Sequence, residues 1–325
     1  MPPTPHTRTA RFPTRNGPRL PYLVYRTTPR DRWILRMLHE HRLLTGPDLY
    51  ALAFTNVRVA NRRLATLTEL ALTDRFRPPR AQYGNQPWHY TLGPAGATII
   101  AAERATTPSA LGYQRTKLLA QAARPDLPHT TGCNTALTRL AATARHTVHA
   151  HRLTVWWSAY SAQAVWGDMI RPDAYAVWEN PQEPDPRTAC AFFYEYDTGT
   201  ESLIQLLGKL PGYRRLRDQQ NASHPILLHL PNPTREQHLH EQLRANPPGL
   251  PIATTNPHTT RLALGATLDA DIWLPTGGNH RHPLTTLPAA LTALGHPLAV
   301  PVRHDPDVHA PAPLLDQPHP WHPHP

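Results

Sequence analysis

The sequence predicts an α+β protein with two domains, of which the second is an α/β domain with a mixed sheet. Three observations lead to this prediction. The chain has 325 residues, which is more than one hydrophobic core usually supports. Apolar residues recur at helical spacing between residues 31 and 71, and from residue 151 onward short apolar strands are interspersed with helices. We therefore expect a helical domain near the N-terminus and a sheet-containing domain after it.

The charge of the chain is unevenly distributed. Residues 1–100 contain 15 Arg and no Lys against 5 Asp and Glu, whereas residues 101–325 contain 18 basic and 18 acidic residues. The net charge of +10, counted with neutral histidine, therefore lies entirely in the first third. A genome rich in G and C would enrich arginine along the whole chain and not at one end only. A segregated basic segment of this kind is typical of a nucleic-acid-binding module.

The smaller domain is predicted over residues 29–105, after a basic arm (residues 1–28) that is rich in Pro, Thr and Arg and is expected to be disordered. A first helix is expected to begin at Asp31 as its N-cap, a second near Pro47, and a third to span residues 57–70. The residues after them predict two strands around a loop rich in Pro, Gly, Asn and Arg. A helix-turn-helix followed by such a hairpin is a winged helix.

The third helix and the hairpin carry the predicted DNA-binding residues. Four polar side chains on the helix face away from the apolar stripe, where a recognition helix presents side chains to base edges: Arg58, Asn61, Arg62 and Thr66. Three arginines on the hairpin are suited to phosphate contacts: Arg75, Arg77 and Arg80. Any one of these arginines could equally lie on a solvated face without a function. Their combination predicts binding to double-stranded DNA.

A helical connector is expected over residues 106–150, and the α/β domain over residues 151–283. Its strands are predicted at "LTVWWSA", "PDAYAVW", "ACAFFYEYD", "PILLHLP" and "LPIATT", with a helix after the third strand and another after the fourth. The order helix, three strands, helix, strand indicates a mixed sheet. Residues 284–325 are rich in Pro, His and Ala, and we expect a low-complexity tail without a packed core.

The third predicted strand carries two acids on one side. Because side chains alternate along a strand, Glu195 and Asp197 point the same way. If the second and third strands pair antiparallel with a register centred on residue 183 or 184, Asp173 lies opposite Glu195. Three carboxylates this close repel one another, so such a group usually holds a divalent cation or an arginine. Mg²⁺ prefers carboxylates with open water positions and can activate water against a phosphodiester, so these three acids are the predicted metal ligands.

Three segments resemble the replication-relaxation family of bacterial plasmid and integrated-element proteins: "RPDAYAVW", "FFYEYDTGTES" and "GKLPGYRRL", following a winged helix. The family pattern is Pro-Asp at the end of one strand, acid-x-Asp-x-Gly-Thr-Glu on the next, and a Lys followed by a Tyr on the following helix. The resemblance covers about residues 30–280. It implies a role in plasmid DNA replication and relaxation, and a second domain similar to the PD-(D/E)XK nucleases.

One position departs from that nuclease motif. Where the motif has lysine, this chain has Asp197, and a carboxylate cannot neutralise a developing phosphorane as an ammonium does. Lys209 is the expected substitute, because Glu201, Gln205 and Lys209 fall on one face of the next predicted helix. The chain has two lysines against 31 arginines, which favours a need for a compact charge at this position. The predicted catalytic residues are Asp173, Glu195, Asp197 and Lys209.

A structural interpretation of the same residues is also open. Thr198 and Glu201 match a capping box, and Asp197 could stabilise the same helix through its dipole. A third alternative is a nuclease-like sheet that binds DNA without cutting it.

Other features limit the classes of function. Cys133 and Cys190 lie far apart without a CxxC partner, so neither a disulfide framework nor a zinc site is predicted. The chain has no run of 18 apolar residues, no phosphate-binding loop and no serine-hydrolase elbow. We expect a cytoplasmic protein that acts on plasmid or mobile-element DNA without membrane association, with double-stranded DNA and a replication protein as partners and Mg²⁺ as the one cofactor to consider. The alternatives are an active Mg²⁺-dependent nicking endonuclease and a winged-helix transcription regulator.

Overall fold

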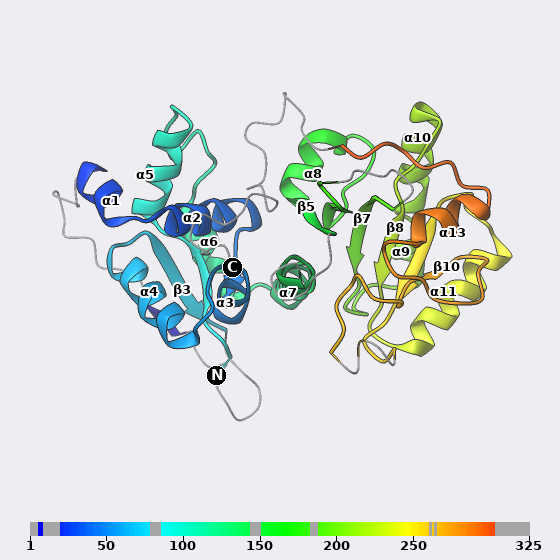
Figure 1. The fold of residues 1–325 in the computed structure, drawn as a ribbon, viewed down its shortest axis with the longest axis horizontal. Helices are drawn as coiled ribbons and strands as arrows, with labels where there is room; N and C mark the ends of the chain where they lie inside the picture. The colour runs from blue at the N-terminus through cyan, green and yellow to red at the C-terminus, as the bar shows by residue number, and fades with distance from the viewer. Residues whose placement is uncertain are drawn as a thin grey trace. The chain divides into compact units, whose positions relative to one another are not determined.

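The computed structural model describes residues 6–8, 20–78, 86–143, 151–182, 188–259, 262 and 265–302. The chain forms two compact units, the first reaching Thr138 and the second beginning at Arg139 (Figure 1). Helices, a small antiparallel sheet and a six-stranded mixed sheet confirm the predicted α+β class.

The first unit combines helices with a four-stranded sheet. Its helices are α1 (Leu20–Arg26), α2 (Pro29–His41), α3 (Gly46–Ala53), α4 (Val57–Glu69), α5 (Pro94–Glu103), α6 (Arg115–Ala120), the 3-10 helix η1 (Gln121–Ala123) and α7 (Leu127–Thr143), which continues past the unit boundary. The strands are β1 (His6–Arg8), β2 (Leu44–Thr45), β3 (Thr73–Arg77) and β4 (His89–Leu92), in the antiparallel order β1-β3-β4-β2. From α2 to β4, three helices are followed by a hairpin, in the order that the sequence predicted.

Two capping boxes start α2 and α3. Thr28 and Thr45 are the N-caps, and each hydroxyl accepts a hydrogen bond from the backbone N–H of an aspartate three residues later, Asp31 or Asp48, whose carboxylate accepts one in return. The prediction of Asp31 as the N-cap is therefore wrong by three residues. Pro29 takes the first helical position, where a missing N–H costs nothing, and this places Thr28 at the cap.

Part of the N-terminal arm is ordered. Strand β1 extends the sheet by pairing antiparallel with β3, and α1 packs on α5 with Leu23 only 2 % exposed. The prediction of a disordered arm over residues 1–28 is therefore wrong for β1 and α1. Composition cannot reveal these contacts, because a sheet edge and a hydrophobic contact on another helix supply them. Residues 1–5 and 9–19 lie outside the described ranges.

The second unit contains the six-stranded sheet. Its strands are β5 (Arg152–Ser158), β6 (Ala174–Glu179), β7 (Cys190–Tyr196), β8 (Ile226–His229), β9 (Ile252–Thr255) and β10 (Leu274–Pro275), in the order β10-β9-β8-β7-β6-β5. Strands β5, β6 and β7 are antiparallel, β7, β8 and β9 are parallel, and β10 is antiparallel to β9. The helices are α8 (Ala159–Trp166), α9 (Leu203–Leu207), α10 (Leu210–Gln220), α11 (Pro233–Ala245) and α13 (Leu287–Ala293).

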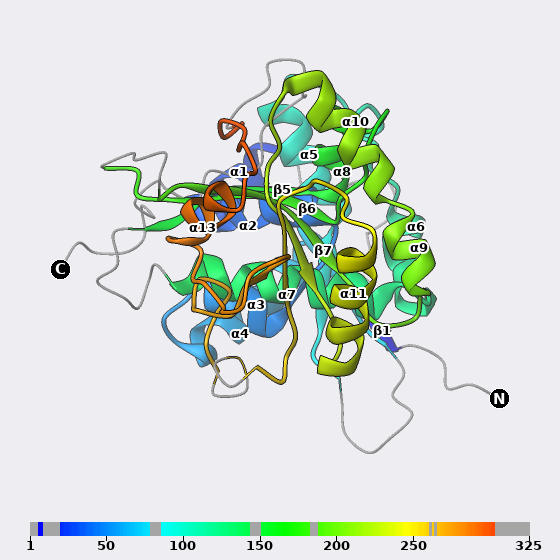
Figure 2. The same ribbon diagram turned by 90° about the vertical axis from the view of Figure 1, so that its right-hand side faces the viewer.

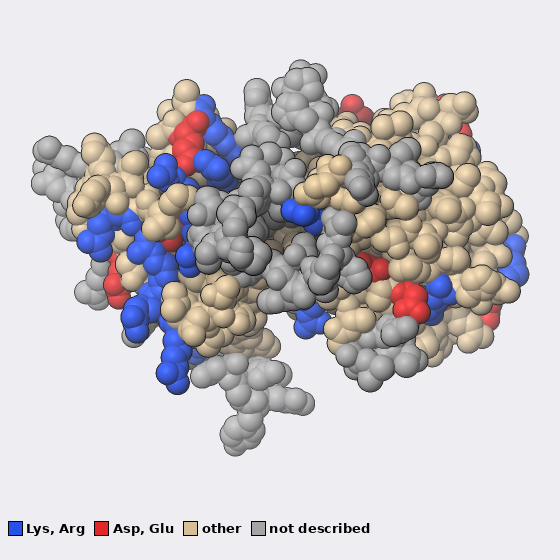
Figure 3. Space-filling view, in the orientation of Figure 1, with Lys and Arg blue, Asp and Glu red and all other residues tan. Residues whose placement is uncertain are grey.

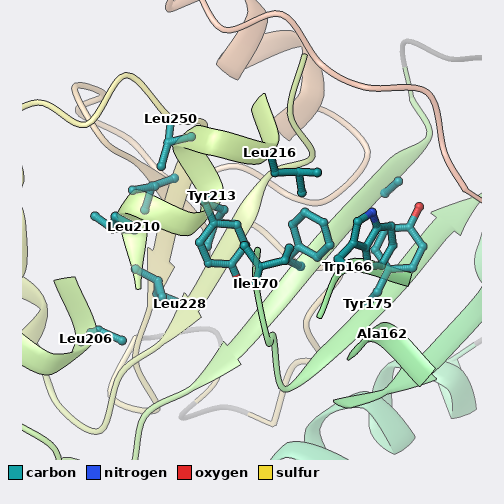
Figure 4. Close-up of a cluster of buried hydrophobic side chains, with 14 of the residues drawn as sticks. Ala162, Trp166, Ile170, Tyr175, Leu206, Leu210, Tyr213, Leu216, Leu228 and Leu250 are labelled. Carbon is teal, nitrogen blue, oxygen red and sulfur yellow. The ribbon is translucent and has the colours of Figure 1, made fainter. Parts of the chain in front are cut away.

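One hydrophobic cluster of this unit lies between the sheet and α10. Figure 2 shows α10 and α11 on one side of the strands and α13 on the other. Aromatic rings pack around Phe193: Trp166 of α8 lies edge to face with a centroid distance of 4.9 Å, and Tyr213 of α10 lies tilted at 5.4 Å. Figure 4 shows the leucines that continue this cluster, among them Leu210 and Leu228. Alternation along β7 therefore directs Phe193 and, two residues on, Glu195 toward these helices.

The predicted low-complexity tail is folded over its first half. Leu284, Leu287 and Leu291 are completely buried, the last two on α13. Farther along, Leu298 forms a β-bridge with Ser223 and the backbone N–H of residue 302 donates to the Tyr175 hydroxyl at 2.7 Å. The prediction that residues 284–325 lack a packed core is therefore wrong up to residue 302, because spaced leucines within a Pro-rich segment suffice to bury one short helix. Residues 303–325 lie outside the described ranges.

Candidate active site and nucleic-acid interface

Glu195 lies near the end of β7 and is 2 % exposed. Lys209 Nζ donates to its Oε2 at 2.8 Å, and the Tyr213 hydroxyl donates to its Oε1 at 2.6 Å. Each carboxylate oxygen therefore accepts a short hydrogen bond, one of them from an ammonium. We call Glu195, Lys209 and Tyr213, together with Asp173, the Glu195 cluster.

A helix break places Lys209 in this cluster. The sequence predicted one helix over residues 201–210, whereas the structure has α9 and then α10. Pro211 explains the break, because a proline in a helix interior has no N–H and clashes with the carbonyl four residues before it. Lys209 is the N-cap of α10 and Tyr213 follows one turn later, so both side chains reach Glu195.

Gly212 allows α10 to pack closely enough for these contacts. A Cβ atom at this position would lie 2.2 Å from the carbonyl oxygen of Met169, closer than any side chain tolerates. Leu210 and Leu216 on the same helix are buried in the core. Two contacts of α10 thus determine the position of Tyr213: the close approach of Gly212 to the backbone of Met169, and the packing of Leu210 and Leu216 in the core.

Asp173 lies just before β6, opposite Glu195. Ala174 pairs with Tyr194, and one further step of this antiparallel register places Asp173 across from Glu195, as predicted for a register centred on residue 184. The backbone N–H of Tyr196 donates to Asp173 Oδ2 at 2.8 Å. This bond directs the Asp173 carboxylate to the same end of the sheet as the cluster.

The cluster combines a titrating acid with a permanent cation. Burial and, second, the charge of Asp173 raise the pKa of Glu195 to about 7, although Lys209 and Tyr213 oppose this rise. Burial lowers the pKa of Lys209, but the carboxylates of Glu195 and Asp173 outweigh burial and the net change is upward. Burial and Glu195 raise the pKa of Tyr213, so it remains a hydrogen-bond donor. An acid that titrates near neutral pH beside a fixed ammonium can take part in proton transfer.

Helix α4 presents an exposed polar face. Asn56 caps it by accepting hydrogen bonds from the backbone N–H groups of Arg58 and Val59 at 2.9 and 3.2 Å. The buried side of the helix consists of Ala60, Leu64, Leu67 and Thr68. The predicted DNA-binding residues Arg58, Asn61 and Arg62 are exposed, whereas Thr66 is half-buried and its hydroxyl donates to the Arg62 carbonyl at 3.2 Å. Figure 3 shows Lys and Arg side chains gathered over this region of the first unit.

The two described hairpin arginines share an aromatic surface. The guanidinium carbons of Arg75 and Arg77 lie 4.4 and 4.2 Å from the centroid of the Trp88 ring. Cation–π stacking of this kind holds arginine side chains in place while leaving donor groups for an anion. Arg80, the third predicted phosphate contact, lies outside the described residues.

Comparison with known families identifies the chain. Residues 35–226 match the profile of the replication-relaxation family, and this is more than half of the chain. The chain belongs to the replication-relaxation family. Membership indicates a role in the replication or relaxation of mobile DNA. No curated protein and no solved structure matches the chain.

None of the helices in the described ranges is long and apolar enough to cross a membrane.

The Asp of the acid-x-Asp pattern, Asp197, is held apart from the cluster. It forms an ion pair with Arg235 of α11 and accepts a hydrogen bond from the backbone N–H of Gly199 at 2.7 Å. Arg235 also donates to the Glu201 carbonyl at 2.6 Å, so it holds the loop that follows β7. Of the four predicted catalytic residues, the structure brings together three: Asp173, Glu195 and Lys209. Among the described residues, no group of three or more His, Cys, Asp or Glu side chains is arranged to hold a metal ion.

The capping box proposed for Thr198 and Glu201 is not formed. Helix α9 begins four residues later than that box requires, with Ser202 as its N-cap and Gln205 as the reciprocal acceptor. The chain turns first, because Gly199 adopts a φ of 80° that favours glycine. The structural interpretation of "TGTE" as a helix start is therefore wrong, and "SLIQ" takes that role.

Two residues of the site were not identified from the sequence. Tyr213 belongs to the Lys-then-Tyr pattern of the family, yet only the fold shows that its hydroxyl reaches Glu195. Arg235 lies 38 residues from Asp197, and no local pattern connects them.

Arg63 lies on α4 between the predicted base-contacting residues, but its role is structural, because its Nε donates to Asp31 at 3.0 Å.

Proposed function

We propose that this protein binds duplex DNA of a plasmid or other mobile element through its first unit, a winged helix, during replication or relaxation of that DNA. The exposed polar face of α4 carries the proposal. Arg58 and Arg62 project from the side opposite Leu64, in a segment that holds the whole net charge of the chain. Arginines so placed can form bidentate hydrogen bonds with guanine in the major groove.

The hairpin arginines would add contacts of another kind. Arg75 and Arg77 stack on Trp88 and are only half-buried, so their remaining N–H groups are suited to phosphate oxygens. The second unit would engage the same DNA or a replication protein. Phosphate contacts make the affinity depend strongly on salt.

The test is DNA binding measured by fluorescence anisotropy with labelled duplexes at several salt concentrations. We expect the double substitution Arg58→Ala and Arg62→Ala to weaken binding by at least about ten-fold and to reduce sequence preference. The matched control is Arg36→Ala, which removes an exposed arginine of α2 that pairs with Glu103. Absence of duplex binding by the wild type, or equal affinity of the double variant and the control, would refute the proposal.

The Glu195 cluster favours a second candidate function, metal-dependent nicking of DNA. Asp173 and Glu195 are the oxygen ligands that Mg²⁺ would take, because carboxylates are among the ligands that it prefers. A bound Mg²⁺ supplies activation of water toward a phosphodiester. Lys209 would provide a cation beside these acids for charge that develops on a phosphate. Asp197 is not part of this set, since Arg235 neutralises it.

Supercoiled plasmid incubated with the protein and Mg²⁺ tests this candidate. Nicking that is lost in Asp173→Asn and in Glu195→Gln, but kept in Asp218→Asn, would support it. Asp218 is an exposed acid on α10 that pairs with Arg217. Intact supercoiled plasmid at a large excess of wild-type protein would exclude nicking, and would leave DNA binding by the first unit untouched.

A further inference from the structure

The first turn of α4 exposes a hydrophobic side chain between arginines. Val59 is 51 % exposed, although valine is usually buried. At about 100° per residue, Val59 lies about 60° around the helix from Arg62, and Arg62 lies about 40° from Arg58 on its other side. All three side chains therefore share the face opposite Leu64. The face thus offers two guanidinium groups and one branched apolar group within a turn and a half.

The position of Val59 is well defined. Asn56 accepts a hydrogen bond from its backbone N–H at 3.2 Å, and Arg63 anchors the same helix to Asp31. A β-branched side chain in a helix has essentially one χ1 rotamer, so the two methyl groups point in a set direction. A rigid apolar group costs little entropy when it makes a contact.

We propose that Val59 contacts the C5-methyl group of a thymine in the major groove, next to a guanine bound by Arg58 or Arg62. Thymine is the one base with a methyl group on this edge, and guanine is the base that arginine binds bidentately. The proposal rests on the proposed DNA-binding function and adds to it the chemistry of the site: α4 prefers a thymine adjacent to guanine.

Val57 is a matched control. It is also 51 % exposed and lies two residues away on the same helix. It lies about 160° around the helix from Val59, however, away from the face that carries Arg62. If exposed valines on α4 only lowered solubility or contacted protein, the two positions would behave alike.

The experiment first selects bound duplexes from a random pool and then replaces each thymine of the selected site, one at a time, by deoxyuridine. This exchange removes the methyl group and leaves base pairing unchanged. We expect one such exchange to weaken wild-type binding about four-fold, the value of one buried methyl group. Val59→Ala should bind both duplexes equally, whereas Val57→Ala should keep the four-fold difference.

The other possible results distinguish failure of the Val59 inference from failure of the proposed DNA binding. If the wild type binds its selected duplex and no thymine exchange alters the affinity, the inference is overturned and DNA binding stands. If Val59→Ala retains the discrimination, another residue contacts the methyl group and the inference fails. If no duplex is bound at all, the proposed function itself fails. Should Val59→Ala melt at a much lower temperature, Val59→Thr keeps the shape of the side chain and is expected to show reduced discrimination.

Discussion

Tyr213→Phe removes one hydrogen bond from a buried carboxylate and keeps the aromatic ring in the core. The Tyr213 hydroxyl donates to Glu195 Oε1 at 2.6 Å, and each of the two residues is 2 % exposed. A hydrogen bond to a charged group contributes about 1.5–3 kcal/mol to stability. We expect the substitution to lower the free energy of unfolding by about 2 kcal/mol at pH 8.5, where Glu195 is ionised.

The effect should depend on pH, because the pKa of Glu195 is raised from 4.5 to about 7. The folded protein binds this proton more tightly than the unfolded chain does. The resulting stabilisation is present below pH 4.5 and is lost as the pH rises through 7. At pH 5.5 the buried acid is protonated, and Tyr213→Phe then removes a hydrogen bond between neutral groups. The expected loss shrinks to about 1 kcal/mol.

Urea denaturation at pH 5.5 and 8.5, followed by circular dichroism, measures both values. The control is Tyr194→Phe, because the Tyr194 hydroxyl lies 2.7 Å from His229 Nδ1 in the same sheet. Burial lowers the pKa of His229 to about 4, so His229 is neutral at both pH values, and the stability lost in Tyr194→Phe should be the same at both. Equal losses for Tyr213→Phe at both pH values, or a larger loss at pH 5.5, would refute the assignment of Glu195 as a charged acceptor at high pH.

Two further predictions concern the second unit. Arg235→Gln should lower the free energy of unfolding by about 2–4 kcal/mol, because it leaves the buried side chain of Asp197 without its cation. The control Arg244→Gln changes an exposed arginine of the same helix and should alter that free energy by less than about 0.5 kcal/mol. Equal melting temperatures of the two variants in calorimetry would contradict this prediction. Burial lowers the pKa of His224 from 6.5 to about 4, so the stabilisation that neutral His224 provides is present above pH 6.5 and is lost as the pH falls toward 4. The urea midpoint should decline over that interval, and less steeply in His224→Phe; parallel declines would count against the role of His224.

The alternation of β7 and its pairing with β6 could be predicted from the sequence. Period-two patterns are local, and an antiparallel pairing of consecutive strands leaves few registers that bury the same faces, so we could predict that Asp173 lies opposite Glu195. The exposed side of α4 was predictable for the same reason, since a 3.6-residue period assigns Arg58 and Arg62 to the face opposite the apolar stripe.

Packing between segments that are distant in the sequence could not be predicted from local patterns. Helix α1 is ordered by a contact with α5, and α13 by burial of leucines from a Pro-rich segment. Both helices lie in segments rich in Pro, and composition alone therefore predicted disorder. In both cases a few apolar side chains suffice because a larger folded surface already exists for them to cover.

The sequence by itself determined the two-domain order, the strands, the helical faces and the acids at the end of β7, because each of these follows from periodicity over a few residues. Only the tertiary structure decided the partner of each acid. Glu195 is held by Lys209 and Tyr213 because α10 packs at Gly212 against the segment between α8 and β6. Asp197, two residues away on the same face, is neutralised instead by Arg235 of another helix. Ion pairing depends on which helix end comes within a few ångströms, and long-range packing sets that distance.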